Sequence, residues 1–294
     1  YNGITHGVYY KKADLEVLAR AVERKVHSNQ NFVKANIRGC YRLGNKLLRA
    51  ATVPEANMLK KMTDKELLKL LQTFRHAYQN FLQYLMYPHL VERFFVKTIE
   101  KHLRQCLQKR QEEQHFETVY QIFTTPTLHD IEEQIDMHHV AYQIQKNGWN
   151  SRTKLMIKDL YTKYLWQPFW TVEANPLTFK YYEDASKALA NSKISLADEI
   201  KRIVTEQETR KQTLKKTLDR IQAPQTLKHL VELLQAYMYL RTYRKNIISK
   251  AHYLHLHLLR EIGSRMGLGK NISLAGYQEM IDFLKTGVKV SRIT

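Results

Sequence analysis

The stretch 227–269 constrains the fold more than any other part of the chain, because it runs for over forty residues without a proline. Apolar or aromatic side chains recur along it at helical spacing: Leu230, Leu233, Leu234, Tyr237, Met238, Leu240, Ile247, Ile248, His252, Leu256 and Leu259. This pattern predicts one helix over about 227–268, roughly 60 Å long at about 1.5 Å per residue. Gly267 and Gly269 suit its end, since glycine adopts the left-handed conformation without a side-chain clash.

Composition extends this helical prediction to the whole chain. The 294 residues include only ten glycines and six prolines, and 44% are hydrophobic, which is enough for an ordinary core. We therefore expect an all-α fold, an irregular array of helices built around 227–268. The exception is residues 1–12, where Ile4, Val8, Tyr9 and Tyr10 favour a short β element. No repeat or low-complexity linker marks a boundary, so 1–294 is predicted to form a single helical domain.

Further helices follow from apolar periodicity and from capping residues. Thr63 and Glu66 form a capping-box pattern before a helix over about 64–86. Pro88 is a suitable start for the next helix, which the polar run 109–114 is expected to extend. Gly39 and Gly44 interrupt a helical stretch that ends near Ala51, which predicts a bend or a closely packed neighbour. The other expected helices cover about 14–26, 127–146, 149–170, 179–189, 196–221, with Ser195 as its cap, and 273–287, capped by Ser273.

The chain is strongly basic, with 47 Lys and Arg against 28 Asp and Glu, a net charge of +19. Residues 201–250 hold twelve basic and four acidic side chains, a local excess of +8. Such a field attracts nucleic acid, nucleotide phosphates, an acidic surface or an acidic neighbouring domain. The alternative is a lysine-rich solvated surface without a specific partner.

Cysteine content and hydropathy bear on the compartment. Cys40 and Cys106 are too few for a disulfide framework, and no apolar run approaches the 18 residues that would span a membrane. We expect a cytoplasmic protein without membrane contact. Arg38 and Arg42 flank Cys40 and could make it more acidic, although a buried small hydrophobe is the simpler role.

Motifs for catalysis and cofactors are absent from the sequence. Neither phosphate-loop nor dinucleotide-binding signatures occur, and no catalytic residue or cofactor is predicted. Glu112 with His115 and Asp136 with His139 have the spacing of di-metal ligands, but two further glutamates would be needed, so no metal site is expected. His252, His255 and His257 are interpreted as structural residues of the helix pack.

The region 150–287 carries a family resemblance. Its matching residues are Arg241, Lys245, Glu261, Ile262, Arg265, Gly267, Glu279 and Leu284, with a weaker match at 163–166 and 177–179. It resembles the helical region that precedes the swivelling phosphohistidine domain in phosphoenolpyruvate-utilising enzymes and their uncharacterised relatives. The chain departs from the pattern at Ala275 and Gly276. The resemblance implies a non-catalytic scaffold or acceptor-binding region of a phosphotransferase, in a fragment of a longer chain with adjoining catalytic domains as partners.

Two sets of charged residues within this region lead to separate predictions. Arg241 and Lys245 share a helix face and, with Arg244, are predicted to bind an anionic substrate or an adjoining domain. Glu261 and Arg265 are four residues apart in the favoured order, which predicts a structural ion pair at the helix end. The alternative function is a basic helical protein that binds nucleic acid or another polyanion through the helices 196–221 and 227–268. In the second of these, tyrosines are interleaved with basic residues over 237–245, a pattern that could stack on bases.

Overall fold

The computed structural model describes residues 11–28, 30–125, 131–169 and 175–288, and all regular structure within these ranges is helical. The predicted all-α class is confirmed. A β element was expected over 1–12, of which residues 1–10 lie outside the described ranges; Lys11 follows them, and Lys12 begins α1 (Lys12–Ser28). No described helix combines the length and the apolar character that crossing a bilayer would require.

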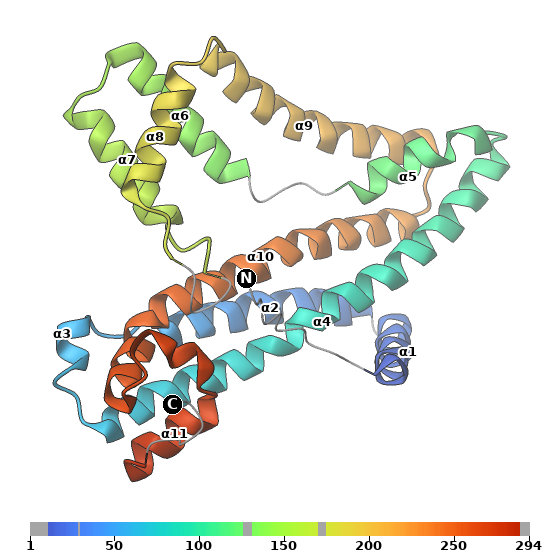
Figure 1. The fold of residues 1–294 in the computed structure, drawn as a ribbon. Coiled ribbons are helices and arrows are strands. Elements are labelled where there is room, and N and C mark those ends of the chain that lie inside the picture. The colour runs from blue at the N-terminus through green and yellow to red at the C-terminus, as the bar shows by residue number, and fades with distance from the viewer. Residues whose placement is uncertain (1–10, 29, 126–130, 170–174, 289–294) are drawn as a thin grey trace.

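The long helix α10 (Gln225–Met266) lies at the centre of the fold, close to the predicted bounds (Figure 1). It packs against α2 (Gln30–Ala51) and α4 (Asp64–Lys109), and fully buried Tyr237 and Leu240 lie in the shared core. Gly267 ends α10 with φ of 78°, a left-handed conformation that suits glycine.

Helix α4 corrects the prediction of two helices separated at Pro88, because it continues through this proline for 46 residues. An interior proline removes one backbone hydrogen bond. Buried Phe81 and Phe95 on either side of it belong to hydrophobic clusters shared with α10, and this packing offsets the loss. The predicted continuation through 109–114 is also wrong. The chain leaves α4 after Lys109, passes through a short 3-10 helix, Glu113–His115, and forms α5 (Phe116–Thr124).

A second group of helices carries its own small core. It consists of α6 (Ile131–Asn147), α7 (Ser151–Tyr164) and α8 (Phe179–Ala190), and α9 (Leu196–Arg220) packs against α6. The core contains Val140, Ile157, Leu160, Tyr164 and Tyr182. In Figure 1, α9 and α10 diverge from the turn that joins them, and this helical group lies at the far end of α9.

The helix ends test several capping predictions. Thr63 and Glu66 form the predicted capping box, with the Thr63 amide donating to Glu66 Oε2 at 2.7 Å. Ser195 caps α9 as predicted, accepting from the Asp198 amide at 3.4 Å. Ser273 does not cap the last helix. It lies in a 3-10 helix, Gly269–Leu274, and α11 (Tyr277–Thr286) begins after Gly276. The short α3 (Ala56–Leu59) completes the described helices.

Candidate functional site

The charged side chains on the exposed face of α2 are all positive. Among its described side chains, 31–51, the exposed ones are Asn31, Lys34, Ala35, Arg38, Arg42, Asn45, Lys46 and Arg49. At about 100° per residue they occupy an arc of roughly 120°, and the basic residues span about 22 Å along the helix. We call the five basic side chains, Lys34, Arg38, Arg42, Lys46 and Arg49, the α2 ridge.

The charge of the α2 ridge is not compensated by neighbouring carboxylates. No acidic residue occurs anywhere in α2. Among the ion pairs that the described part of the chain forms, none includes a ridge residue. The ridge therefore places five positive charges on one exposed helix face.

Two glycines bring the opposite face of α2 very close to its neighbours. A Cβ atom at Gly39 would lie 2.3 Å from the Tyr84 hydroxyl oxygen, and one at Gly44 would lie 2.7 Å from that of Tyr243. This close approach confirms the second of the two predicted reasons for the glycines. Cys40 between them is fully buried, and burial raises its pKa to about 12. It is a packed thiol, and the expected simpler role is the correct one.

A shallow hollow lies beside one end of the ridge, between α2 and α4. It has a volume of about 570 Å³, and its polar lining comes from Lys46, Arg49, Gln72, Thr73 and His76, with no acidic residue. The His76 ring Nε2 is 2.9 Å from the Asn80 amide nitrogen. Hydrogen-bonding side chains of α4 therefore lie beside the basic surface of α2.

The residues predicted to bind an anion do not share one surface. Arg241 is exposed, and its guanidinium lies 3.7 Å from a Glu92 carboxylate oxygen. Lys245 is also exposed. Arg244 is only 3% exposed and donates to the carbonyl oxygens of Tyr84 at 2.6 Å and Leu240 at 3.2 Å. Burial lowers the pKa of Arg244 to about 10, so it remains charged at neutral pH and holds helices together.

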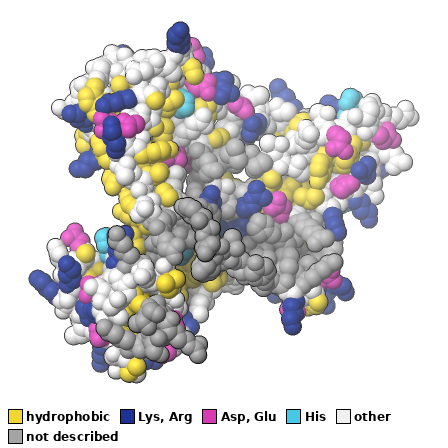
Figure 2. All heavy atoms as spheres, in the orientation of Figure 1, with side chains coloured by type: hydrophobic (Ala, Val, Ile, Leu, Met, Phe, Trp, Pro, Cys, Tyr) yellow, Lys and Arg dark blue, Asp and Glu magenta, His cyan; other side chains and the backbone are white. Residues whose placement is uncertain are grey.

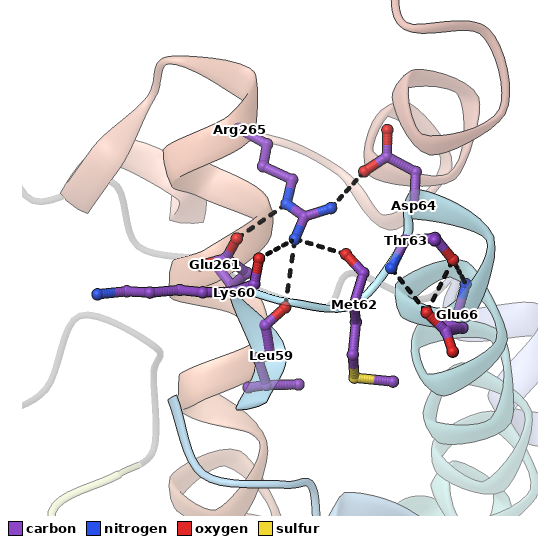
Figure 3. A network of polar contacts seen from close by, with 8 residues as sticks. All are labelled: Leu59, Lys60, Met62, Thr63, Asp64, Glu66, Glu261 and Arg265. Carbon is purple, nitrogen blue, oxygen red and sulfur yellow. Dashed lines mark hydrogen bonds and ion pairs between the residues drawn. The ribbon is translucent and has the colours of Figure 1, made fainter. Parts of the chain in front are cut away.

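Arg265 forms the predicted pair with Glu261 and several contacts that the sequence did not reveal (Figure 3). Its Nε donates to Glu261 Oε1 at 2.8 Å, and its Nη1 donates to Asp64 Oδ1 at 2.6 Å. Its Nη2 donates to the carbonyl oxygens of Leu59 at 3.2 Å and Met62 at 2.9 Å. This guanidinium fixes the loop between α3 and α4 to the end of α10.

The helix α9 was expected to bind polyanions, but several of its basic side chains contact carboxylates. Arg202 binds Glu199 at 2.7 Å and Glu206 at 3.1 Å, and Arg210 also binds Glu206. Arg220 reaches Glu112 near the end of α4. On the face seen in Figure 2, acidic and basic side chains are likewise interspersed among hydrophobic and other ones.

A large hollow lies between α5, α9 and α10 and has a volume of about 1010 Å³. Ile122, Leu214 and Val231 contribute apolar surface, while Arg202 and Arg210 line it together with their partner Glu206. Its charged lining is mixed, with five basic residues, Lys201, Arg202, Arg210, Lys211 and Lys228, beside three acidic ones, Asp198, Glu206 and Glu232. Of the tyrosines expected to stack on bases, Tyr239 and Tyr243 are half-buried, while Tyr237 is fully buried and donates to Asn36 Oδ1 at 2.9 Å.

The two carboxylates considered as metal ligands bind basic or hydroxyl groups instead. Glu112 accepts from Arg110 and Arg220, and Asp136 accepts from Lys163 and Tyr164. Within the described ranges no three His, Cys, Asp or Glu side chains lie close enough to hold a metal ion. His255 is fully buried, with its ring centroid 3.7 Å from that of Phe74.

Our sequence reasoning missed the α2 ridge, although a signal was present. Basic residues recur at 34, 38, 42, 46 and 49, and the 22-residue helix contains no acid. The regional charge excess at 201–250 concealed it, because an excess summed over a long window does not show which charges are paired. Comparisons with models of protein families, with curated proteins and with solved structures found no match for this chain.

Proposed function

We propose that the protein binds a polyanion through the α2 ridge. The observation that supports this is the group of five exposed cations on one helix face without a carboxylate among them. Polyanions such as nucleic acids hold condensed counterions, and a row of Lys and Arg side chains releases them on binding. The proposal keeps the polyanion class expected from composition and moves the contact surface to α2.

The local charge balance favours α2 over α9 as this surface. Helix α2 carries five basic and no acidic residues, a balance of +5. Helix α9 carries seven basic and five acidic residues, which leaves +2. Exposed ion pairs contribute little to stability, but they do place a negative charge beside each cation and so weaken the attraction for an external anion.

The test compares two variants that lower the net charge equally. In the ridge variant, Lys34, Arg38, Arg42, Lys46 and Arg49 are changed to Gln. In the control variant, five exposed lysines in or next to α9 are changed to Gln: Lys193, Lys201, Lys211, Lys215 and Lys216. Affinity for heparin and for mixed-sequence nucleic acid is measured at about 50 mM salt, where phosphate contacts are strong.

We expect the ridge variant to bind at least about tenfold more weakly than the wild-type chain, and the control variant to bind within about threefold of it. All ten substituted side chains are exposed, so both variants should keep the wild-type circular dichroism and melting temperature. Equal losses in the two variants would show that net charge alone matters. Absence of binding by the wild-type chain would overturn the proposal.

A second proposal rests on the resemblance to phosphoenolpyruvate-utilising enzymes: a helical region that helps to bind an anionic substrate. It is supported by the matching Glu261, Arg265 and Gly267, which end the long helix before the short α11. Calorimetric titration with phosphoenolpyruvate tests it. Changing Arg241 or Lys245 to Ala should weaken binding with little change in melting temperature, and no heat of binding to the wild-type chain would contradict it.

A further inference from the structure

We infer that the polyanion bound by the α2 ridge is a double-stranded nucleic acid, contacted through its phosphate backbones. This inference rests on the proposed function and specifies its ligand. Three features of the ridge support it. The exposed arc has no aromatic or large apolar side chain, the cations are spread across the whole arc, and α2 is packed tightly against its neighbours.

The exposed arc offers no platform on which unpaired bases could stack. Proteins that hold single strands combine basic grooves with exposed aromatic rings. The arc contains Lys, Arg, Asn and Ala and no aromatic side chain. Tyr41 is half-buried, and its ring centroid lies 4.5 Å from that of Tyr243. The ridge can therefore contact phosphates, but it has little to offer the faces of unpaired bases.

The same arc lacks the apolar side chains that a membrane-surface helix inserts between lipids. Interfacial helices bury large apolar residues on the face that meets the membrane. On α2 these residues point inward: Val33 and Leu47 are buried, while Leu43 and Leu48 are half-buried against the core. Charge without apolar insertion favours a ligand whose own surface is hydrated phosphate.

The spread of the cations suits two phosphate rows better than one. Lys34 and Lys46 lie at the edges of the arc, about 120° apart, and Arg38, Arg42 and Arg49 lie between them. Over the ridge length of about 22 Å, a duplex presents roughly thirteen phosphates, since it carries one charge per about 1.7 Å. Cations on both edges can approach the two strands that border a groove. Gln72, Thr73 and His76 lie next to Lys46 and offer further hydrogen-bonding groups.

Because α2 is packed tightly against its neighbours, the ridge has little freedom to follow a flexible strand. The contacts of Gly39 with Tyr84 and of Gly44 with Tyr243 hold α2 against α4 and α10 along its middle. A ligand that lines up along this fixed row of cations loses the least conformational entropy on binding when it is itself straight and stiff. Double helices have this property over 22 Å, because their persistence length is about 50 nm.

Fluorescence anisotropy with labelled oligonucleotides of 24 nucleotides tests the inference in full-length protein. The oligonucleotide probes are duplex DNA, duplex RNA and the corresponding single strands. In a separate arm, binding to vesicles of mixed neutral and anionic phospholipid is measured. Each affinity is measured across a salt series. The wild-type chain, the ridge variant and the α9 control variant are compared on every probe.

We expect at least one duplex to bind about tenfold or more tightly than its single strands. Its logarithmic salt slope should be about −4 to −5, as five phosphate contacts predict for a duplex. Each single Lys→Gln or Arg→Gln change on the ridge should reduce the slope by about 0.9, with little dependence on sequence. The two duplex arms show whether DNA or RNA is preferred.

The outcomes separate this inference from the proposed function. Equal or tighter binding of single strands, or binding of vesicles alone, with loss in the ridge variant, would overturn the duplex assignment and leave the polyanion-binding surface in place. Failure of all probes to bind would overturn both. Duplex binding that the ridge variant retains would also overturn both, because the contact surface would lie elsewhere.

Discussion

Helices α2 and α9 are both basic and of similar length, with 22 and 25 residues, yet they present their charges in opposite ways. In α9 the buried residues are Leu196, Ile203 and Thr217, and its arginines contact carboxylates on the same helix or on a neighbour. In α2 one face is pressed against two helices and the other carries unopposed cations. The comparison teaches that the distribution of acids, more than the number of bases, decides where a basic protein can attract an anion.

The largest effect is expected for Arg265→Ala, compared with Arg202→Ala on α9. Arg265 binds backbone carbonyls and two carboxylates from three segments, so its loss should lower the free energy of unfolding by about 2–4 kcal/mol. The free energy of unfolding of Arg265→Lys should lie between those of the wild type and Arg265→Ala, because an ammonium group lacks the planar fork of a guanidinium. Chemical denaturation measures both.

Arg202→Ala should leave the denaturation midpoint nearly unchanged, because this side chain is exposed and its pairs are screened by water. A loss as large as that of Arg265→Ala would show that the ion pairs of α9 hold the fold together. The contrast between a stabilising arginine network and a surface one would then fail.

Gly39→Ala tests how tightly α2 packs against α4. The new Cβ would lie 2.3 Å from the buried Tyr84 hydroxyl oxygen, and this overpacking should exceed the gain of about 1 kcal/mol that alanine brings to a helix. We expect a net loss of about 1–2 kcal/mol in thermal or chemical unfolding. The exposed Val204 of α9 provides the matched control, since Val204→Ala should change stability by less than about 0.5 kcal/mol. A neutral or stabilising Gly39→Ala would mean that α2 can move outward freely.

His255→Phe distinguishes a buried titratable group from the exposed cations of the ridge. Neither ring nitrogen of His255 has a hydrogen-bond partner in the described part of the chain, and burial, together with His252, lowers its pKa to about 3. Because the folded pKa lies below the unfolded value of about 6.5, the stability is fully present above pH 6.5 and declines as pH falls towards 3. We expect His255→Phe to stabilise the fold by about 1 kcal/mol at pH 7 and to flatten this decline.

Polyanion affinity gives this pH experiment its internal control. Lysine and arginine stay charged between pH 7 and 5, so the difference in affinity between the wild-type chain and the ridge variant should remain constant while wild-type stability falls. If His255→Phe left the pH dependence of melting unchanged, another group would be responsible for it. If affinity and stability changed together in the wild type, the binding surface would not be independent of the core.

The smallest effect concerns the α9 ion pairs in acid. A hydrogen bond from Arg202 lowers the pKa of Glu199, and one from Lys228 lowers the pKa of Asp219. Since these folded pKa values lie below the unfolded ones, the stabilisation is present above about pH 4.5 and is lost as pH falls through the folded values. Amide-exchange protection should therefore decrease slightly more in α9 than in α2, which has no carboxylate. Measuring it in the His255→Phe background removes the larger global effect, and an equal decrease in α2 would contradict the comparison.

Local features of the sequence were sufficient to predict the helices and many of their ends. The capping box of Thr63 and Glu66, the cap at Ser195 and the stop at Gly267 depend on contacts within one helical turn, so the residue pattern contains all the information. The all-α class and the bounds of α10 follow from the same periodicity. The continuity of α4 through Pro88 did not follow, because packing of Phe81 and Phe95 far from the proline compensates for the lost hydrogen bond.

The sequence by itself determined that this chain is helical, basic and built around one long helix, since these properties depend on composition and on spacing within a few turns. Tertiary structure alone decided which cations face solvent. Arg244 and Arg241 differ by three positions, yet the first is buried against the Tyr84 carbonyl and the second is exposed. The outward face of α2 likewise depends on Gly39 and Gly44 meeting tyrosines from distant segments. Exposure is set by such long-range contacts. The spacing of the cations along α2 is visible in the sequence, but only the folded molecule shows that all five of them face solvent.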